Sequence, residues 1–408
     1  MPIKTLHVTN AYHATSGGIS TFYRAMLNAA NRKGRQMRLV VPGDQTKVES
    51  IGDFGIIYHI KAPRTPIFDR RYRLLLPTTY LLNGALSRIL RSESPDLVEV
   101  CDKYAVSWLG GILRERIIPG VRRPVLVGMS CERMDDNVRA FVTNSRFAKR
   151  WTRFYLGNMY MPLFDYHIAN SEYTADELRA ALVSRHKRDI HVRPMGADVA
   201  DYASAQRSDA GRRNLLSLCN GERETRALLY AGRLSYEKNI ALLIDMMELL
   251  VGDSTTDYRL IIAGDGPLAD WFEAEARRRA PGRIFSLGHI GNRALLVDLY
   301  ANCDVFVHPN PREPFGIAPL EAMAAGLPLV APRSGGVLSY ANESNSWLAE
   351  PAGEAFATAV RSVFSDDDAR REKVARALAT TQLYTWESVT AQFFDLYDEL
   401  HADFPATR

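Results

Sequence analysis

Short apolar runs rich in β-branched residues alternate with helix-period segments along almost the whole chain, and this alternation constrains the fold most strongly. Ile3–Thr9 reads as a first strand and Ser20–Ala30 as the helix after it. Further strands of the first half are expected at Met37–Val41, Leu97–Val100, Val125–Ser130 and Tyr166–Ala169. Strands separated by helical crossovers run parallel, so the pattern predicts an α/β protein.

A polar stretch without a clear period, from about residue 201 to 225, interrupts this series. The pattern then restarts with strands expected at Ala227–Leu234, Leu260–Ala263, Ile284–Gly288, Val305–His308 and Pro328–Ala331. The 408 residues also exceed the roughly 250 to 300 residues at which single cores stop growing. We therefore expect two domains, 1–200 and 201–385, followed by an amphipathic helix at Trp386–Leu400.

Cysteine usage and hydropathy favour a cytoplasmic protein. The four cysteines lie far apart without ligand spacing, which argues against a zinc site and against a disulfide framework. They are Cys101, Cys131, Cys219 and Cys303. The N-terminus lacks the pattern of a secretory signal, and no apolar run is long enough to span a bilayer. Charge is uneven, because residues 1–200 carry +12 and the remainder −8 of the overall +4.

A glycine pair, Gly17-Gly18, follows the first expected strand and opens the first helix. Glycine lets a ligand approach the backbone, and a helix N-terminus offers N–H groups to a phosphate. A flexible strand-to-helix turn would have the same sequence, so both interpretations stay open for this loop.

Two segments of the second half end expected strands in the same way. Gly232-Arg233-Leu234-Ser235-Tyr236-Glu237-Lys238-Asn239 places two cations where open α/β sheets bind ligands, and these could converge on one diphosphate. A solvated pair of surface cations is the alternative. Gly264-Asp265-Gly266-Pro267 follows the next strand, and turn chemistry alone would explain it.

The most informative segment is Glu313-Pro314-Phe315-Gly316-Ile317-Ala318-Pro319-Leu320-Glu321. A carboxylate precedes a Pro-Phe-Gly turn without an evident packing purpose, and a second carboxylate falls inside the helix that follows. Turn amides can bind sugar hydroxyls, and a carboxylate can accept from the vicinal hydroxyls of a ribose. Two solvent-facing glutamates at a helix start are the alternative.

These motifs, in this order, resemble the donor half of family 4 of the retaining glycosyltransferases, whose patterns are GR…KN, GDGP and E-x7-E. The first half resembles the family at Gly17-Gly18-Ile19, at Asn170-Ser171-Glu172 and at Pro194-Met195-Gly196-Ala197-Asp198. The resemblance implies the GT-B fold, with two Rossmann-like domains facing across a cleft. It also implies that residues 386–408 form a helix that packs back on the N-terminal domain.

The resemblance further implies a role for each matching residue. Arg233 and Lys238 would bind the donor diphosphate, together with the backbone at Gly17 and Gly18. Glu321 would hold the ribose, while Glu313 and the amides of Phe315, Gly316 and Ile317 would hold the transferred sugar. Gly264 and Asp265 would belong to the same donor site. No metal and no cofactor is expected, because the cations and helix ends supply the positive field.

One position departs from the family pattern. Relatives often carry His-Glu-Arg after the strand expected at Val125–Ser130, whereas this chain reads Cys131-Glu132-Arg133-Met134-Asp135. The thiol of Cys131 is a weak donor, so the role of that histidine could pass to Glu132 or Asp135, or to His13 in the glycine loop. Cys131 could equally be a small buried filler.

Basic and aromatic residues interleave at helical spacing around Arg64–Leu74 and around Arg146–Phe154. Such segments suit an interfacial helix on anionic lipid, although a solvated basic face would look the same. Nucleic acid is not favoured as a partner, because no recognised binding motif accompanies the charge.

We therefore expect a retaining hexosyltransferase that moves a sugar, mannose favoured, from a nucleoside diphosphate to a lipid-linked or polysaccharide-precursor acceptor. The expected location is cytoplasmic, peripheral on the inner face of the membrane. One alternative is a catalytically silent sugar-nucleotide-binding protein. A Rossmann-type NAD-dependent oxidoreductase is a further alternative, but the GxGxxG that it requires after the first strand is absent.

Overall fold

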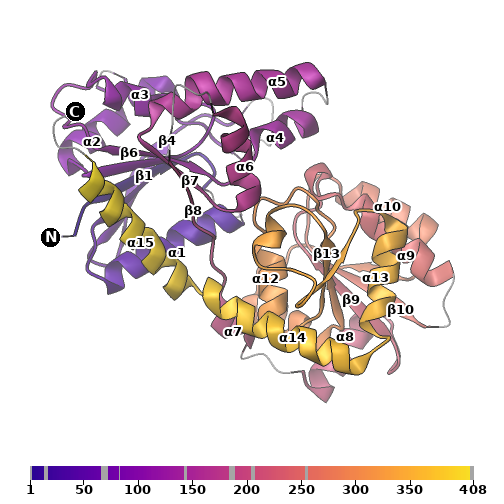
Figure 1. Cartoon of the computed structure of the whole chain (residues 1–408). Helices are drawn as coiled ribbons and strands as arrows, with labels where there is room; N and C mark the ends of the chain where they lie inside the picture. The colour runs from indigo at the N-terminus through magenta and orange to yellow at the C-terminus, as the bar shows by residue number, and fades with distance from the viewer. Residues whose placement is uncertain are drawn as a thin grey trace. The chain divides into compact units, whose positions relative to one another are not determined.

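A computed structural model of the chain describes residues 2–12, 17–65, 72–81, 83–141, 145–182, 189–203, 207–252 and 256–404. The chain divides into two compact units, labelled by their elements in Figure 1. Unit 1 comprises Met1–Met195 together with Trp386–Arg408, and unit 2 comprises Gly196–Thr385. The chain therefore leaves unit 1, forms unit 2 and returns.

Unit 1 is built on a sheet that has eight strands in the described part of the chain, in the order β3-β4-β2-β1-β5-β6-β7-β8. Its neighbouring strands are parallel except for the antiparallel pair β3 and β4. The strands are β1 Thr5–Thr9, β2 Met37–Gly43, β3 Lys47–Ile51, β4 Gly55–Lys61, β5 Leu97–Cys101, β6 Val125–Ser130, β7 Tyr166–Ala169 and β8 Ile190–Val192. The helices are α1 Gly18–Arg32, α2 Ala85–Glu93, α3 Trp108–Arg114, α4 Met134–Phe141, α5 Arg146–Tyr155, α6 Glu172–Ala181 and α15 Trp386–Asp403.

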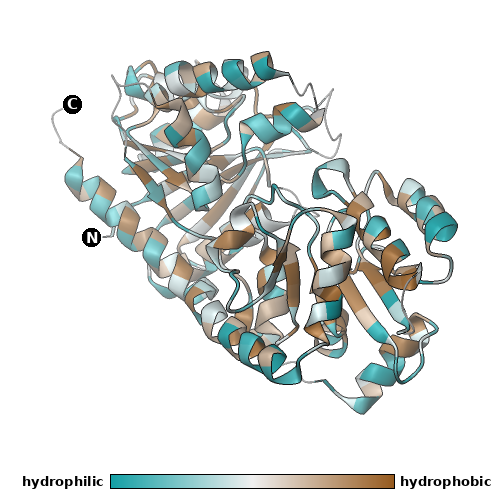
Figure 2. Ribbon diagram, turned by 45° about the vertical axis from the view of Figure 1, so that its right-hand side comes forward, coloured by the Kyte–Doolittle hydropathy of each residue, from teal (hydrophilic) through white to brown (hydrophobic). Residues whose placement is uncertain are grey.

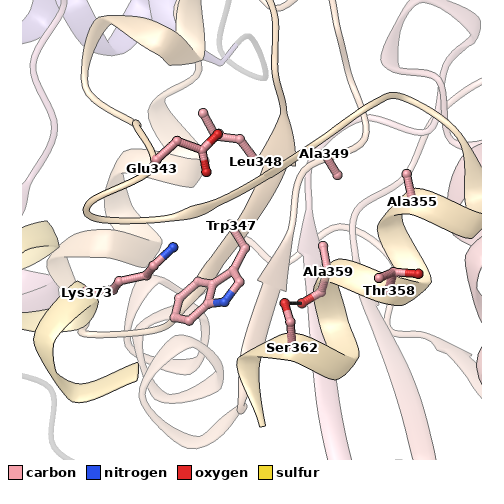
Figure 3. A pocket seen from close by; sticks show the side chains of 9 residues that line it. All are labelled: Glu343, Trp347, Leu348, Ala349, Ala355, Thr358, Ala359, Ser362 and Lys373. Carbon is pink, nitrogen blue, oxygen red and sulfur yellow. Dashed lines mark hydrogen bonds between the residues drawn. The ribbon is translucent and has the colours of Figure 1, made fainter. Parts of the chain in front are cut away.

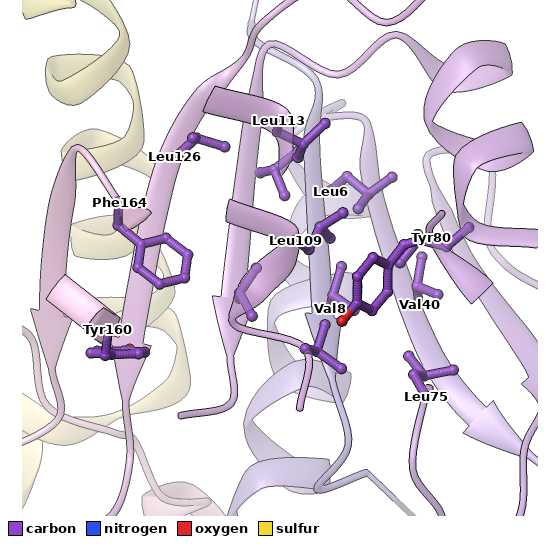
Figure 4. Packing of buried hydrophobic residues seen from close by; sticks show 14 of the residues in the cluster. Leu6, Val8, Val40, Leu75, Tyr80, Leu109, Leu113, Leu126, Tyr160 and Phe164 are labelled. Carbon is purple, nitrogen blue, oxygen red and sulfur yellow. The ribbon is translucent and has the colours of Figure 1, made fainter. Parts of the chain in front are cut away.

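The central strands of unit 1 are buried on both faces, as expected of parallel strands covered by helices. Every residue of β1, β5 and β6 is buried. On one face, Leu6 and Val8 of β1 pack with Tyr80 and with Leu109 and Leu113 of α3 (Figure 4).

The other face of β1 and β5 is covered by α1 and by the C-terminal helix α15. The Phe22 and Phe393 rings lie 5.0 Å apart between their centroids. At the centre, the fully buried Glu99 carboxylate accepts hydrogen bonds from Tyr23 (3.0 Å) and from Tyr397 of α15 (2.6 Å), and His7 Nδ1 lies 2.9 Å from it. The last helix of the chain thus completes the core of unit 1.

Unit 2 is built on a parallel sheet that has six strands in the part of the chain described, in the order β11-β10-β9-β12-β13-β14. The strands are β9 Arg226–Ala231, β10 Tyr258–Ala263, β11 Ile284–Ser286, β12 Val305–Val307, β13 Leu329–Pro332 and β14 Trp347–Ala349. The helices are α7 Val199–Ala203, α8 Asp209–Leu218, α9 Ala241–Gly252, α10 Ala269–Arg279, α11 Arg293–Asn302, α12 Ile317–Ala324, α13 Gly353–Val363 and α14 Asp367–Thr381. Figure 2 shows the strands of both sheets in the brown of hydrophobic residues.

Two segments have a local structure that the sequence did not predict. The stretch from 201 to 225 contains α8, whose N-cap Ser208 accepts a hydrogen bond from the Gly211 amide at 3.0 Å. Its buried face is narrow, which explains why no helical period is visible in the sequence. Around Arg64–Leu74, the described ends pair as an antiparallel bridge between Arg64 and Arg73 and do not form a helix there.

Candidate active site

The loops that follow β9, β10 and β12 carry the motif residues of unit 2. These three strands are adjacent and parallel, so their carboxyl ends meet at one edge of the sheet. Asn239 ties two of the loops together, because its side-chain amide donates to the Pro309 carbonyl at 3.0 Å. The predicted donor residues of the second half are therefore gathered on three neighbouring loops and the helix α12.

Lys238 and Glu313, which lie 75 positions apart in the chain, form an ion pair at this edge. The Lys238 ammonium donates to both carboxylate oxygens of Glu313, at 3.0 and 2.8 Å. Asn310 donates to the same carboxylate at 2.9 Å. Glu313 is the more buried partner, with its side chain 11% exposed against 28% for Lys238. The carboxylate is thus held in one orientation by a cation and an amide.

The charge state of this pair follows from its surroundings. Burial alone would raise the pKa of Glu313, but Lys238, His308 and the Asn310 amide together lower it to about 2. Burial lowers the pKa of His308 to about 4, so its imidazole is neutral at physiological pH. His308 Nε2 lies 3.7 Å from the carboxylate and has no hydrogen-bond partner among the described residues. The site therefore holds a fixed anion beside an unsatisfied buried nitrogen.

The turn at Pro314-Phe315-Gly316 has a packing role that the sequence did not reveal. The Phe315 ring is buried and packs edge-on against Tyr340, with 5.3 Å between the ring centroids. Gly316 has a φ of +87°, and the Tyr340 hydroxyl donates to the Phe315 carbonyl at 3.2 Å. The expectation of a turn without a packing purpose was wrong. Tyr340 holds the turn in place through these contacts, and α12 begins directly after the turn at Ile317.

Glu321, on the second turn of α12, lies in different surroundings from Glu313. Burial and the nearby Asp198 raise its pKa to about 8, although Arg293 and a hydrogen bond with Tyr202 act in the opposite direction. Arg293 is itself paired with Asp198 at 2.8 Å. At neutral pH the two glutamates of the segment therefore differ in charge, because Glu313 is ionised and Glu321 is mostly protonated.

Gly264 and Asp265 serve the packing of the loops. A Cβ atom on Gly264 would lie 1.8 Å from the Gly232 carbonyl oxygen, so a larger residue would push the two loops apart. The Leu234 amide donates to the Asp265 carbonyl at 3.1 Å, which joins the loops after β9 and β10. The Asp265 side chain is exposed and accepts from the Gly266 amide at 2.7 Å. Arg233 lies in this joined region, and its carbonyl accepts from Tyr230 at 2.9 Å.

In unit 1, Gly17 and Gly18 lie at the N-terminus of α1. Gly17 is exposed, and a Cβ atom there would meet nothing within 4 Å. Packing thus does not require glycine at this position, and open backbone N–H groups at a helix start suit an anion. His13 lies outside the described residues.

The remaining candidates of unit 1 surround the end of β6. Cys131 is buried, and its sulfur lies 3.6 Å from that of Cys101. This contact and burial raise the pKa of the Cys131 thiol well above its usual value. Asp135 accepts two hydrogen bonds from Arg133, at 2.9 and 2.7 Å, whereas Glu132 accepts from Asn137 at 2.9 Å. Burial raises the pKa of Glu132.

A separate concavity of about 410 Å³ lies beside the edge strand β14 (Figure 3). Trp347, Lys373 and Ser362 line it, and Lys373 Nζ lies 4.8 Å from the Trp347 ring centroid. It includes none of the predicted donor residues. Over the described ranges, no group of three or more His, Cys, Asp or Glu residues could hold a metal ion.

Sequence reasoning did not single out His308, Asn310, Tyr202 or Arg293. His308 was read as the end of a strand, and its position at a carboxyl strand end was the available signal. Tyr202 and Arg293 reach Glu321 from α7 and α11, and nothing in the sequence predicts that contact.

Two family models match the chain. Residues 16–201 match Glycosyltransferase Family 4, and residues 220–379 match Glycosyl transferases group 1. Among characterised proteins, a GDP-mannose-dependent alpha-(1-6)-phosphatidylinositol dimannoside mannosyltransferase of Mycobacterium tuberculosis is 28% identical over 95% of this chain and 94% of its own length. A GDP-mannose-dependent alpha-mannosyltransferase of Corynebacterium glutamicum is 25% identical over 98% of this chain and 90% of its own.

Solved structures match over the full length at low identity, which concerns the fold alone. Sucrose-phosphate synthase from Thermosynechococcus elongatus superposes with a TM-score of 0.74 at 18% identity, covering 98% of this chain and 100% of that one. The catalytic domain of starch synthase IV from Arabidopsis thaliana, bound to ADP and acarbose, gives 0.70 at 13% identity over the same shares of the two chains. The expected α/β fold with two parallel sheets, of the GT-B kind, is thereby confirmed.

Proposed function

The chain is a glycosyltransferase of family 4, and we propose that it transfers a hexose, with mannose favoured, from a nucleoside diphosphate sugar to a lipid-linked or polysaccharide-precursor acceptor. The observation that carries this proposal is the Glu313 carboxylate, held ionised by Lys238 and Asn310 at the carboxyl edge of the unit 2 sheet. A fixed carboxylate beside a cation suits a ligand that joins sugar hydroxyls to a diphosphate.

Each predicted residue has a proposed part in donor binding. Glu313 and the backbone of Phe315, Gly316 and Ile317 accept and donate hydrogen bonds to the sugar, while Glu321 accepts from the ribose. Arg233 and Lys238 balance the diphosphate charge, and the open N-terminus of α1 at Gly17 and Gly18 offers N–H groups to a phosphate.

The proposed reaction retains the anomeric configuration. A bond forms between an acceptor hydroxyl oxygen and the sugar C1, the bond from C1 to the diphosphate oxygen breaks, and the hydroxyl proton passes to the departing phosphate. This assignment gives no acid–base task to Cys131, whose buried thiol contacts Cys101. Glu132 and Asp135 remain candidates on the acceptor side.

The choice of donor and acceptor is supported by the two relatives that match nearly the whole chain. Both are named as GDP-mannose-dependent, and one acts on a phosphatidylinositol dimannoside. We therefore propose GDP-mannose as the donor and a lipid-linked acceptor at an anionic membrane surface. No helix among the described residues is long and apolar enough to cross a membrane.

The test is donor turnover with GDP-mannose, UDP-glucose and UDP-N-acetylglucosamine. We expect GDP-mannose to be used best, and Glu313→Ala to lower kcat/KM at least about a hundredfold, because preorganised contacts of this kind contribute about 10² to 10³. Glu313→Gln keeps the shape and checks that a loss is not one of folding. Glu343→Ala is the matched control, since this glutamate pairs with Arg333 outside the site.

Turnover unchanged by Glu313→Ala would refute the site assignment. Preference for a UDP-sugar would refute the choice of donor. Donor binding without turnover of any donor would favour a sugar-nucleotide-binding protein.

A further inference from the structure

Helix α5, Arg146–Tyr155, is labelled in Figure 1. It exposes three aromatic side chains to solvent. Phe147 is 78% exposed, Trp151 47% and Phe154 58%. Their spacing of four and three residues places them on one side of a helix. The helix has its own buried line at Ala148, Thr152 and Tyr155, and Trp151 stacks on Tyr155 with 5.6 Å between the ring centroids. The aromatic line is thus a second apolar face, which the described residues leave largely exposed.

The helix is also basic and carries no acidic residue. Four exposed cations fill the remaining side of the helix, which neither the buried line nor the aromatic line occupies. They are Arg146, Lys149, Arg150 and Arg153. None of the four forms an ion pair with a described residue.

Several arginines on helices of unit 2 differ in this respect. On α10, Arg277 and Arg278 pair with Glu273 and Glu275 at 3.4 and 2.6 Å, within one turn of the helix. On α14, Arg370 pairs with Asp367 at 2.9 Å. These arginines of α10 and α14 are thus paired with carboxylates of their own helix, whereas the cations of α5 have no such partner among the described residues.

The helix is also preformed and firmly seated. The Ser145 hydroxyl caps its N-terminus by accepting from the Ala148 amide at 3.1 Å. At the other end, the Tyr155 hydroxyl donates to the Lys103 carbonyl at 2.9 Å. Its aromatic and basic faces are therefore presented by a fixed scaffold.

We infer that α5 is a docking helix that seats unit 1 on an anionic lipid surface. The rings of Phe147, Trp151 and Phe154 enter the headgroup region, and the four cations contact lipid phosphates. Rings beside unneutralised cations on one helix are the chemistry that such a surface recognises. The inference deepens the proposed function. It rests on that function in one respect, because a lipid-linked acceptor would lie in a membrane.

The experiment is co-sedimentation of the full chain with vesicles of phosphatidylcholine alone or mixed with phosphatidylglycerol, without donor or acceptor. We expect binding to the anionic vesicles that falls between about 0.1 M and about 0.5 M salt. Phe147→Ser with Phe154→Ser should weaken binding at least about tenfold. Lys149→Gln with Arg153→Gln should weaken vesicle binding about 30-fold, because each cation near the surface contributes slightly more than about fivefold and the two effects multiply.

Matched controls come from α10, which also carries an exposed tryptophan and exposed arginines. Trp271→Ser, and Arg277→Gln with Arg278→Gln, should bind vesicles like the unmodified chain. Because all substituted side chains are exposed, the denaturation midpoints should not change.

Equal binding to neutral vesicles, or wild-type binding by either α5 variant, would overturn the inference. Binding to a DNA duplex in preference to anionic vesicles would overturn it as well. Since vesicle binding is measured without turnover, loss of transfer with intact binding would refute only the proposed function, and intact transfer to a soluble acceptor without vesicle binding would refute only the docking helix.

Discussion

Lys238 and Glu313 compensate each other's charge at the carboxyl edge of the unit 2 sheet. The ammonium is the more exposed of the two, whereas the carboxylate also accepts from Asn310. Lys238 can therefore turn toward a second anion while Glu313 keeps one donor. A cation shared in this way would link the sugar and diphosphate parts of a donor.

Lys238→Ala should weaken the binding of a nucleoside diphosphate about tenfold or more, because one charge-assisted contact contributes about 1.5 to 3 kcal/mol. Isothermal calorimetry with GDP measures this. Lys373→Ala is the control, since that lysine lies beside Trp347 at the separate concavity. An unchanged affinity for GDP would exclude Lys238 from the phosphate site.

The protonation of Glu321 should make nucleotide binding depend on pH. A carboxyl with a pKa of about 8 is mostly protonated at neutral pH, whereas an acceptor for ribose hydroxyls is best ionised. Affinity for GDP should therefore rise about tenfold from about pH 7 to about pH 9. Glu321→Gln, which cannot ionise, should remove the rise.

The same shift has a consequence for stability. The folded-state pKa of Glu321 lies above its ordinary value of 4.5, so the folded state holds the proton more tightly. Its contribution to stability is present below about pH 4.5 and is lost as pH rises through about 8. Relative to Glu321→Gln, the free energy of unfolding should fall over this range, and the opposite trend would contradict the assigned pKa.

The residues of the donor motifs could be named from the sequence, but their contacts could not. Arg233, Lys238, Glu313 and Glu321 stand at strand ends and in a helix that the sequence pattern locates. The pairing of Lys238 with Glu313 joins loops 75 positions apart, and the neighbours of Glu321 come from α7 and α11. Tertiary packing sets these contacts, and with them the opposite pKa shifts of the two glutamates.

At the scale of elements, the C-terminal helix α15 contributes to a buried polar cluster. Tyr397 donates to the Glu99 carboxylate at 2.6 Å in the interior of unit 1. Tyr397→Phe should lower the free energy of unfolding by about 1 to 3 kcal/mol, because the buried carboxyl group of Glu99 loses one donor.

Urea denaturation followed by circular dichroism measures this change. Tyr384→Phe is the comparison, since its hydroxyl donates to the neutral Ser339 carbonyl of unit 2 and should cost only about 0.5 to 1.5 kcal/mol. Equal losses in the free energy of unfolding for the two variants would show that the hydrogen bond to Glu99 contributes no more to stability than the one to the Ser339 carbonyl.

The buried parallel strands were the elements most readily predicted, because their apolar runs are nearly continuous. β1, β5, β6, β10 and β12 all fall within two residues of the expected ranges. The edge strands β3, β8 and β14 were missed, since they are short or only partly buried and lack such runs. The inner strand β4, which is also only partly buried, was missed as well. Helix α8 was missed because few of its residues face the core.

At the scale of the molecule, the division of charge accompanies the division into units. The basic first half contains α5, whose four cations form no ion pair with a described residue, whereas α10 and α14 of unit 2 pair arginines with carboxylates. Net charge alone could therefore not locate an anionic partner. The structure identifies one candidate contact surface in the basic half, the exposed face of α5.

The chain enters and leaves unit 2 through two segments that are tied together. The Ala197 amide donates to the Tyr384 carbonyl at 2.9 Å, close to the first and last residues of that unit. Unit 2 is thus an insertion whose ends meet, which is the arrangement that domain insertion tolerates.

Because α15 follows unit 2 in the sequence but packs in unit 1, it also sets the order in which the two units can fold during translation. Most of unit 1 precedes unit 2 in the sequence, but the Tyr397 and Phe393 side chains that complete its core follow unit 2. Unit 2 is fully translated before them and can fold as soon as it emerges. The core of unit 1 can therefore close only after unit 2 and α15 have been translated, and until then the face of α1 that α15 covers stays open.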